Sequence, residues 1–193
     1  MGYAMARAAL DRGATVTLIS GPTRLQPPAG ARLVTTRSTR EMHDAVMTHL
    51  GAATLVVKAA AVCDYRPRQV AREKIKKSAG RACRLELEAT EDILAEVGAR
   101  KAGRFVVGFA AETAWSLEGA LDKLRRKRAD MLVVNNVLEG GAGFDAETNR
   151  VTLVLASGEH RALPLMAKDA LAHAIWEVIA QHLPARPRGE NAL

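Results

Sequence analysis

Short apolar runs alternate with amphipathic stretches along most of this 193-residue chain. The runs are rich in Val, Leu and Ile, which favour buried strands, and the stretches between them repeat apolar residues every three or four positions, as one face of a helix does. Helices are predicted over residues 2–12, 38–50, 91–101, 115–128 and 168–183. Strands are predicted over residues 14–20, 31–36, 52–61, 84–88, 104–109, 131–135, 150–156 and 160–165. This order indicates a Rossmann-like, doubly wound α/β fold whose mostly parallel sheet ends in a C-terminal β-hairpin.

Capping residues mark the starts of two helices. Ser38 stands three residues before Glu41, which is the spacing of a capping box, where side chains bond the free backbone N–H groups of the first turn. Thr90 stands where the helix over residues 91–101 begins, and its hydroxyl is predicted to cap that helix. Residues 63–80 are polar and basic and show no clear period, so we predict a long functional loop or flap there.

Length and composition fit a single domain. With 48% hydrophobic residues, the chain can bury one core and is well short of two domains. We expect the domain to span residues 1–183 and residues 184–193 to be a disordered tail. No apolar stretch has the length of a membrane span and no signal-peptide pattern opens the chain, so we predict a cytoplasmic protein without a membrane partner. Cys63 and Cys83 have neither metal-ligand spacing nor the pattern of a disulfide framework, and they are predicted to be buried or incidental thiols.

The charge balance indicates an anionic partner. The formal net charge is +7 at pH 7, which favours association with polyanions. Nucleic acid is one alternative, but only 4% of the residues are aromatic and the chain has no RNP, KH or zinc-finger pattern. A small polyanion therefore fits better, and no nucleic-acid partner is predicted.

Candidate site residues follow three of the predicted strands. Open parallel sheets bind ligands at the carboxyl ends of their strands, which here are the segments after Ala61, Phe109 and Asn135. Asp64 presents a carboxylate just beyond the first of them, although such a residue is also common as a turn former or helix cap.

Two groups of lysines could hold phosphates. Lys123 and Lys127 are four positions apart and share one helix face, although basic residues are also favourable at the end of any helix. The run that starts at Lys74 (Lys-Ile-Lys-Lys) is typical of a solvated surface, but a flexible lysine there could instead close over a triphosphate.

Taken together, the segments resemble the phosphopantothenoylcysteine synthetase (phosphopantothenate–cysteine ligase) family. The resemblance rests on residues 59–65 (Ala-Ala-Ala-Val-Cys-Asp-Tyr), 74–77 (Lys-Ile-Lys-Lys) and 108–113 (Gly-Phe-Ala-Ala-Glu-Thr), in this order and spacing. It extends to Ser20-Gly21-Pro22, Asp92-Ile93, Lys123 with Lys127, and Gly143-Phe144, and so covers residues 1–183.

The resemblance implies a cytoplasmic enzyme of coenzyme A biosynthesis that joins 4'-phosphopantothenate to cysteine. In the bacterial form, CTP activates the carboxylate as an acyl-cytidylate with release of pyrophosphate, and the cysteine amine then displaces CMP. Mg²⁺ accompanies the nucleotide. The family also implies a homodimer with active-site parts from the partner, and in bacteria often a phosphopantothenoylcysteine decarboxylase domain fused upstream.

The resemblance also assigns roles to individual residues. It implies that Lys74 is the catalytic flap lysine at the reacting phosphates and that Lys123 and Lys127 hold the nucleotide. Asp64 would bind the nucleotide or its Mg²⁺. The remaining nucleotide contacts implied are Ala60 and Phe109, and Thr90, Glu91, Asp92 and Ile93 at the base or sugar.

The chain departs from the family pattern at four places. Thr90-Glu91 replaces Asn-Pro, Asn136 replaces Asp, and Cys63 replaces Ala. Family members also have a first strand, a Gly-Gly-Thr loop and an Asn-Arg-Ser-Ser-Gly-Lys stretch before the residues that match Met1 onward. We therefore expect a domain that lacks this first strand, and a nucleotide-binding fragment without full ligase activity is the alternative function. Residues 137–165 are the expected dimer arm.

Overall fold

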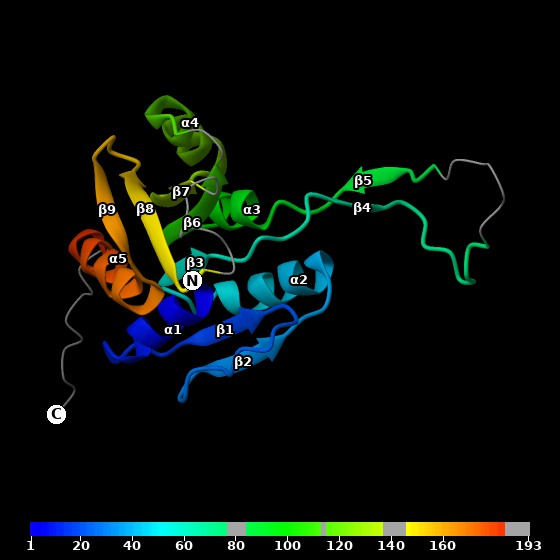
Figure 1. Ribbon diagram of the computed structural model, residues 1–193, viewed down its shortest axis with the longest axis horizontal. Coiled ribbons are helices and arrows are strands. Elements are labelled where there is room, and N and C mark those ends of the chain that lie inside the picture. Colours follow the sequence, from blue (N-terminus) through cyan, green and yellow to red (C-terminus); the bar gives the residue numbers. More distant parts are fainter. Residues whose placement is uncertain (77–83, 113–114, 137–145, 184–193) are drawn as a thin grey trace.

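A mixed five-stranded sheet forms the centre of the molecule. The computed structural model describes residues 1–76, 84–112, 115–136 and 146–183. The strand order is β3 (Leu55–Lys58), β6 (Phe105–Glu112), β7 (Met131–Asn136), β8 (Thr148–Leu155) and β9 (His160–Ala167). The first three strands are parallel, and the last two continue the sheet in antiparallel order (Figure 1). The predicted α/β class and C-terminal hairpin are confirmed.

Helices cover both faces of this sheet. Helices α1 (Gly2–Leu10) and α5 (Lys168–His182) cover one face, and α2 (Thr39–Leu50), α3 (Ile93–Ala99) and α4 (Leu117–Lys127) lie on the other side. Along β6 the burial alternates between the two layers, because Val107 packs with α1 and α5 whereas Val106 packs with the opposite group. Strands buried on both faces are apolar throughout, which is why they appear in the sequence as continuous apolar runs.

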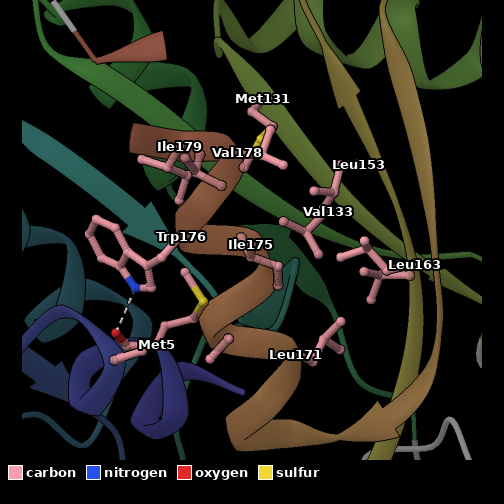
Figure 2. Close-up of a cluster of buried hydrophobic side chains, with 14 of the residues drawn as sticks. Met5, Met131, Val133, Leu153, Leu163, Leu171, Ile175, Trp176, Val178 and Ile179 are labelled. Carbon is pink, nitrogen blue, oxygen red and sulfur yellow. Dashed lines mark hydrogen bonds between the residues drawn. The ribbon is translucent and has the colours of Figure 1, made fainter. Parts of the chain in front are cut away.

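The larger core lies between α5, α1 and the sheet. Figure 2 shows Leu171, Ile175 and Ile179 of α5 along one side of the helix, where their spacing of four makes a single apolar stripe toward the strands. Trp176 of the same helix turns toward α1, and its indole N–H donates to the Met5 carbonyl oxygen at 3.0 Å. This bond satisfies the polar group of a buried ring and ties the chain's first helix to its last.

Strands β1 (Thr17–Ser20) and β2 (Arg32–Thr35) form a separate parallel pair. Helix α2 packs against β1. Within the residues that the structure describes, β1 pairs only with β2 and β3 pairs only with β6, so each has one edge without a strand neighbour. The doubly wound arrangement is therefore present as two parallel pieces and not as one continuous sheet.

An extended arm leaves the body between β3 and α3 (Figure 1). It is built on β4 (Tyr65–Pro67) and β5 (Leu87–Ala89), which pair antiparallel. The prediction of a loop over residues 63–80 is wrong for residues 65–67, which form β4, and residues 77–83 lie outside the described part. A side-chain bond also links the two strands of the arm: the Nε of Arg66 in β4 donates to the Glu88 carboxylate in β5 at 2.8 Å.

The structure corrects the cap of α3. The helix begins at Ile93, and the Asp92 carboxylate accepts a hydrogen bond from the Ala95 N–H at 3.0 Å. Thr90, the predicted cap, instead donates its hydroxyl to the Cys63 carbonyl oxygen at 2.6 Å. Thr90 and Asp92 both have side chains that can cap a helix, but the Thr90 hydroxyl is engaged by Cys63, and Asp92 is the cap.

Other predicted features hold with changed bounds. The predicted cap of α2 by Ser38 is confirmed, since the Glu41 N–H donates to the Ser38 hydroxyl at 3.2 Å, and the Glu41 carboxylate accepts in return from the Arg37 N–H at 2.9 Å. The strand predicted over residues 52–61 is only β3, because the chain leaves the sheet after Lys58. Within the described segments, no helix is both long and apolar enough to span a membrane.

Candidate functional site

The carboxyl ends of three strands meet at one edge of the central sheet. Strands β3, β6 and β7 are parallel neighbours, so their carboxyl ends lie side by side. Lys58 at the end of β3 is in register with Gly108, and Ala111 near the end of β6 is in register with Asn135. This is the edge at which open parallel sheets bind their ligands. The structure therefore brings together the ends of the three strands before those segments, although residues 113–114 and 137–145 lie outside the described part.

Asp92 and Lys127 form an ion pair beside this edge. Asp92 caps α3, Lys127 lies in the last turn of α4, and the ammonium group donates to the carboxylate. Burial disfavours the charged form of Asp92, but the hydrogen bonds from Lys127 and from the Ala95 N–H outweigh it, so its pKa is lowered. The Lys127 side chain is only 20% exposed, so its charge is poorly screened by water.

Lys123 lies one turn earlier on the same face of α4. Its ammonium donates to the Glu112 carboxylate, at the end of β6, at 3.0 Å. Each of the two lysines is thus held toward the sheet edge by one carboxylate. A polyphosphate offers several oxygens to the same two ammonium groups, so it can replace or share these single partners.

Lys58 is a further cation at this edge that the sequence analysis did not select. It is half-buried, and burial lowers its pKa. The charges of Asp92 and Asp64 act to raise that pKa, and those of Lys123 and Lys127 lower it. Lys58 therefore lies among the predicted nucleotide ligands. Its signal in the sequence was a lone lysine in an otherwise apolar strand.

The loop after β3 is held by Thr90. The Thr90 N–H donates to the Asp64 carbonyl oxygen at 2.9 Å, beside the bond from its hydroxyl to Cys63. The Asp64 side chain is exposed. The described residues contain no group of three or more His, Cys, Asp or Glu side chains that could hold a metal ion by themselves. Asp64 can therefore serve only as one carboxylate ligand of a cation that also binds phosphate oxygens.

Glu91 is engaged in an ion cluster. Its carboxylate accepts from Arg66 at 3.1 Å and contacts Arg40 at 2.8 Å. Its pKa is lowered, first by a hydrogen bond that the carboxylate accepts from the residue's own backbone N–H and then by these two arginines. The cluster joins the arm to α2 and leaves Glu91 less available for the base or sugar than the resemblance implies.

The side chains of three other predicted ligands, Ile93, Ala60 and Phe109, do not converge on a common site. Ile93 is 3% exposed and packs in the core under α3, so a contact of its side chain with a nucleotide is not supported. Ala60 packs with the same layer, whereas Phe109 packs with the layer of α1 and α5 on the opposite face. Their backbones lie near the common edge, but the Phe109 ring and the α4 lysines are on different faces of the sheet.

Lys74 lies on the arm, away from the other candidates. It is exposed, and the segment that contains it continues outward beyond β4 (Figure 1). The structure of one chain does not bring it to Lys123 or Lys127. The predicted elements at Thr113 and at Gly143-Phe144 lie outside the described residues.

Comparisons with known proteins agree with the fold and with the resemblance. The model of the family DFP, "DNA/pantothenate metabolism flavoprotein C-terminal domain", matches residues 1–183. The Coenzyme A biosynthesis bifunctional protein CoaBC of Bacillus subtilis is 44% identical over 181 residues, which are 93% of this chain and 44% of that protein. The CoaBC of Vibrio cholerae is 43% identical over 185 residues, which are 95% of this chain and 46% of that protein. The chain thus spans about half the length of the curated relatives it matches.

Two solved structures share the fold, and the family follows from the match. The crystal structure of the C-terminal domain of CoaBC has a TM-score of 0.78 at 40% identity and covers 94% of this chain and 82% of that chain. The DNA/pantothenate metabolism flavoprotein from Streptococcus pneumoniae has a TM-score of 0.78 at 17% identity, covering 93% and 86%, and supports the fold alone. Since the family model spans residues 1–183, this chain belongs to the family of the DNA/pantothenate metabolism flavoprotein C-terminal domain.

Proposed function

We propose that this chain is a CTP-dependent ligase domain that joins 4'-phosphopantothenate to cysteine in coenzyme A biosynthesis. The observation that carries the proposal is the group of cations formed by Lys58 at the end of β3 and by Lys123 and Lys127 on α4, which bond Glu112 and Asp92. The names of the relatives support the pathway, and the resemblance of the site segments supports the reaction.

The chemistry requires charge neutralisation at a triphosphate. A carboxylate becomes a good electrophile when its oxygen attacks the α-phosphorus of CTP, the bond to pyrophosphate breaks, and a mixed anhydride forms. The cysteine amine then attacks the carbonyl carbon, CMP leaves, the amine loses a proton, and an amide results. Lys123 and Lys127 would bind the phosphates and stabilise the charge that develops on the leaving pyrophosphate.

Magnesium fits the same edge. Bound to the phosphates, Mg²⁺ would neutralise further charge, and it typically keeps only one or two carboxylate ligands. Asp64 offers one such exposed carboxylate beside the cations.

Alkylation of Cys63 tests the location of the nucleotide. Cys63 is exposed and directly precedes Asp64, and in a Cys83→Ser variant it is the only cysteine of the chain. We expect CTP with Mg²⁺ to slow its reaction with iodoacetamide at least about threefold, because bound ligand excludes the reagent. Mass spectrometry follows the modified fraction.

Two controls make this labelling specific. Adding Lys127→Ala should restore the fast reaction at the same CTP concentration. Duplex DNA of equal phosphate concentration at 0.2 M salt should give no protection, because binding to a phosphate backbone weakens with salt. Equal labelling with and without CTP contradicts the proposed site, and protection by DNA at that salt favours the nucleic-acid alternative.

We infer further that the arm binds a second copy of the chain. Five large apolar side chains on it are 56 to 83% exposed: Tyr65, Val70, Ile75, Leu85 and Leu87. A two-stranded ribbon is marginal in water, and exposed apolar side chains gathered on one segment indicate an interface. In a homodimer the arm would carry Lys74 to the nucleotide of the partner subunit, which reconciles its predicted role with its distance from the α4 lysines.

The hairpin of β8 and β9 is a weaker candidate for this interface than the sequence predicted. Its apolar residues Val151, Leu153 and Leu163 are buried in the chain's own core. The hairpin docks on β7 and α5 and so needs no partner to cover these side chains. The decarboxylase domain implied by the bifunctional relatives stays a proposed partner.

Substitution on the arm separates the two candidate interfaces. We expect the wild-type chain to be a dimer by light scattering at micromolar concentration, and Val70→Asp with Leu87→Asp to be a monomer, because two charges would enter an apolar contact. The matched control is Leu165→Asp on β9, a position 41% exposed, which should remain a dimer. A monomeric wild type, or a monomer produced only by Leu165→Asp, contradicts the arm interface.

A further inference from the structure

A cavity lined by cationic side chains lies at the end of β6 opposite to the proposed nucleotide site. Its volume is about 300 Å³, and it is bounded by the loop before β6, the last two turns of α4 and the turn between β8 and β9. The cavity is therefore beside the first residues of β6, whereas the proposed nucleotide site follows its last residues. Helix α4 lies between the two places, since its last two turns carry both Arg125 of the cavity and Lys127 of the proposed site.

Three cationic side chains line the cavity: Lys101, Arg125 and Arg128. The Lys101 ammonium is neutralised by one carboxylate oxygen of Asp130 at 2.6 Å. The other oxygen of Asp130 accepts a hydrogen bond from the Val106 N–H of β6. Within the described part of the chain, neither arginine forms an ion pair with a carboxylate. The cavity consequently retains the positive charge of two guanidinium groups.

The backbone at Arg128 is unusual for an arginine. Its φ is +50°, in the left-handed region, at the position that ends α4. Glycine is the residue that adopts this helix-ending conformation most easily.

The cavity and the proposed nucleotide site lie on different sides of α4. Leu121 and Arg125 are four residues apart and so lie on one side of the helix, and both line the cavity together with Arg128, the residue that ends α4. Lys123 and Lys127 lie on another side, toward the carboxylates at the sheet edge. One helix thus presents two pairs of cations to two different places.

We propose that this cavity binds a small organic anion that carries a phosphate, sulfonate or carboxylate group beside an apolar group. Arg125 and Arg128 would pair with the anionic group, for which the planar guanidinium is well suited. The apolar part would lie against Leu121 and Leu124, which form part of the wall. The site is distinct from the one that binds CTP, and it does not depend on the ligase proposal.

Fluorescence titration with 1-anilinonaphthalene-8-sulfonate, a sulfonate on an aromatic body, tests the site on the full chain with CTP and Mg²⁺ present. We expect saturable binding that weakens at least about tenfold in Arg125→Gln with Arg128→Gln, because a charge-assisted contact contributes a factor of this size. The matched control is Arg126→Gln, since Arg126 bonds Asp122 on the same helix and does not line the cavity. The Arg126→Gln variant should bind the probe with the affinity of the wild type.

A second variant tests the cavity without changing α4, in case the arginine substitutions disturb the folding of that helix. Ser157→Glu places a carboxylate on the far wall, in the turn between β8 and β9, and should weaken the probe as well. Thermal unfolding of each variant identifies any that are not folded. Unchanged affinity in both the double arginine variant and Ser157→Glu, or an equal loss in Arg126→Gln, overturns the proposal. So does an equal loss in Lys127→Ala, which would place the probe in the nucleotide site.

Discussion

Replacing Lys127 by alanine is expected to weaken CTP binding about 10- to 100-fold, and replacing Lys123 should have an effect of the same kind. A charge-assisted hydrogen bond to phosphate is worth roughly 1.5 to 3 kcal/mol. Removing Lys127 also leaves Asp92 without its partner, which adds an unpaired negative charge beside the phosphates. Isothermal titration calorimetry with CTP and Mg²⁺ measures the change.

A matched control separates this effect from the general charge of α4. Arg126 lies on the same helix and bonds Asp122 at 2.9 Å, away from the sheet edge. Arg126→Ala removes one positive charge and should leave the CTP affinity unchanged. Unaltered affinity in both lysine variants, or an equal loss in Arg126→Ala, would show that the nucleotide binds elsewhere.

Gly98→Ala is expected to produce the largest loss of stability, about 3 kcal/mol in the free energy of unfolding. A Cβ at this position of α3 would lie 1.9 Å from the Lys127 carbonyl oxygen, so the last turn of α4 would have to move. Overpacking of this kind typically costs about 1 to 3 kcal/mol and outweighs the roughly 0.5 to 1 kcal/mol that alanine gains over glycine in a helix. Because α3 and α4 carry Asp92 and Lys127, CTP affinity should fall with it.

Gly119→Ala is the control for this substitution. Gly119 also lies in a helix, but a Cβ there would be 3.6 Å from the Ser116 hydroxyl, which is an ordinary contact. This variant should be as stable as the wild type or up to about 1 kcal/mol more stable. Urea denaturation followed by circular dichroism measures both. Equal stability of Gly98→Ala and the wild type contradicts the close packing of the two helices.

The sequence predicted those features whose cause is local. Buried strands such as β6 and β7 appear as apolar runs because both faces are covered. The capping box at Ser38 was predictable because donor and acceptor are three residues apart. The hairpin of β8 and β9 was predictable from its two apolar runs and the turn between them.

Features with a tertiary cause were missed. The pairing of β4 with β5 joins residues 20 to 24 positions apart through polar segments, so no local period marks it. Thr90 has the chemistry of a helix cap, but its hydroxyl bonds the Cys63 carbonyl. Ile93 matches a family motif, yet the fold turns its side chain into the core. Lys58 comes near the predicted ligands Asp92, Lys123 and Lys127 only in the folded chain, where β3 pairs with β6.

The ligase reaction itself is the most direct test of the proposed function. The purified 193-residue chain is incubated with 4'-phosphopantothenate, cysteine, CTP and Mg²⁺, and pyrophosphate and the amide product are measured together. The proposed function predicts CTP-dependent formation of one amide for each pyrophosphate released, and loss of both in Lys127→Ala. Binding of CTP without pyrophosphate release or amide formation would contradict it and would favour a nucleotide-binding fragment.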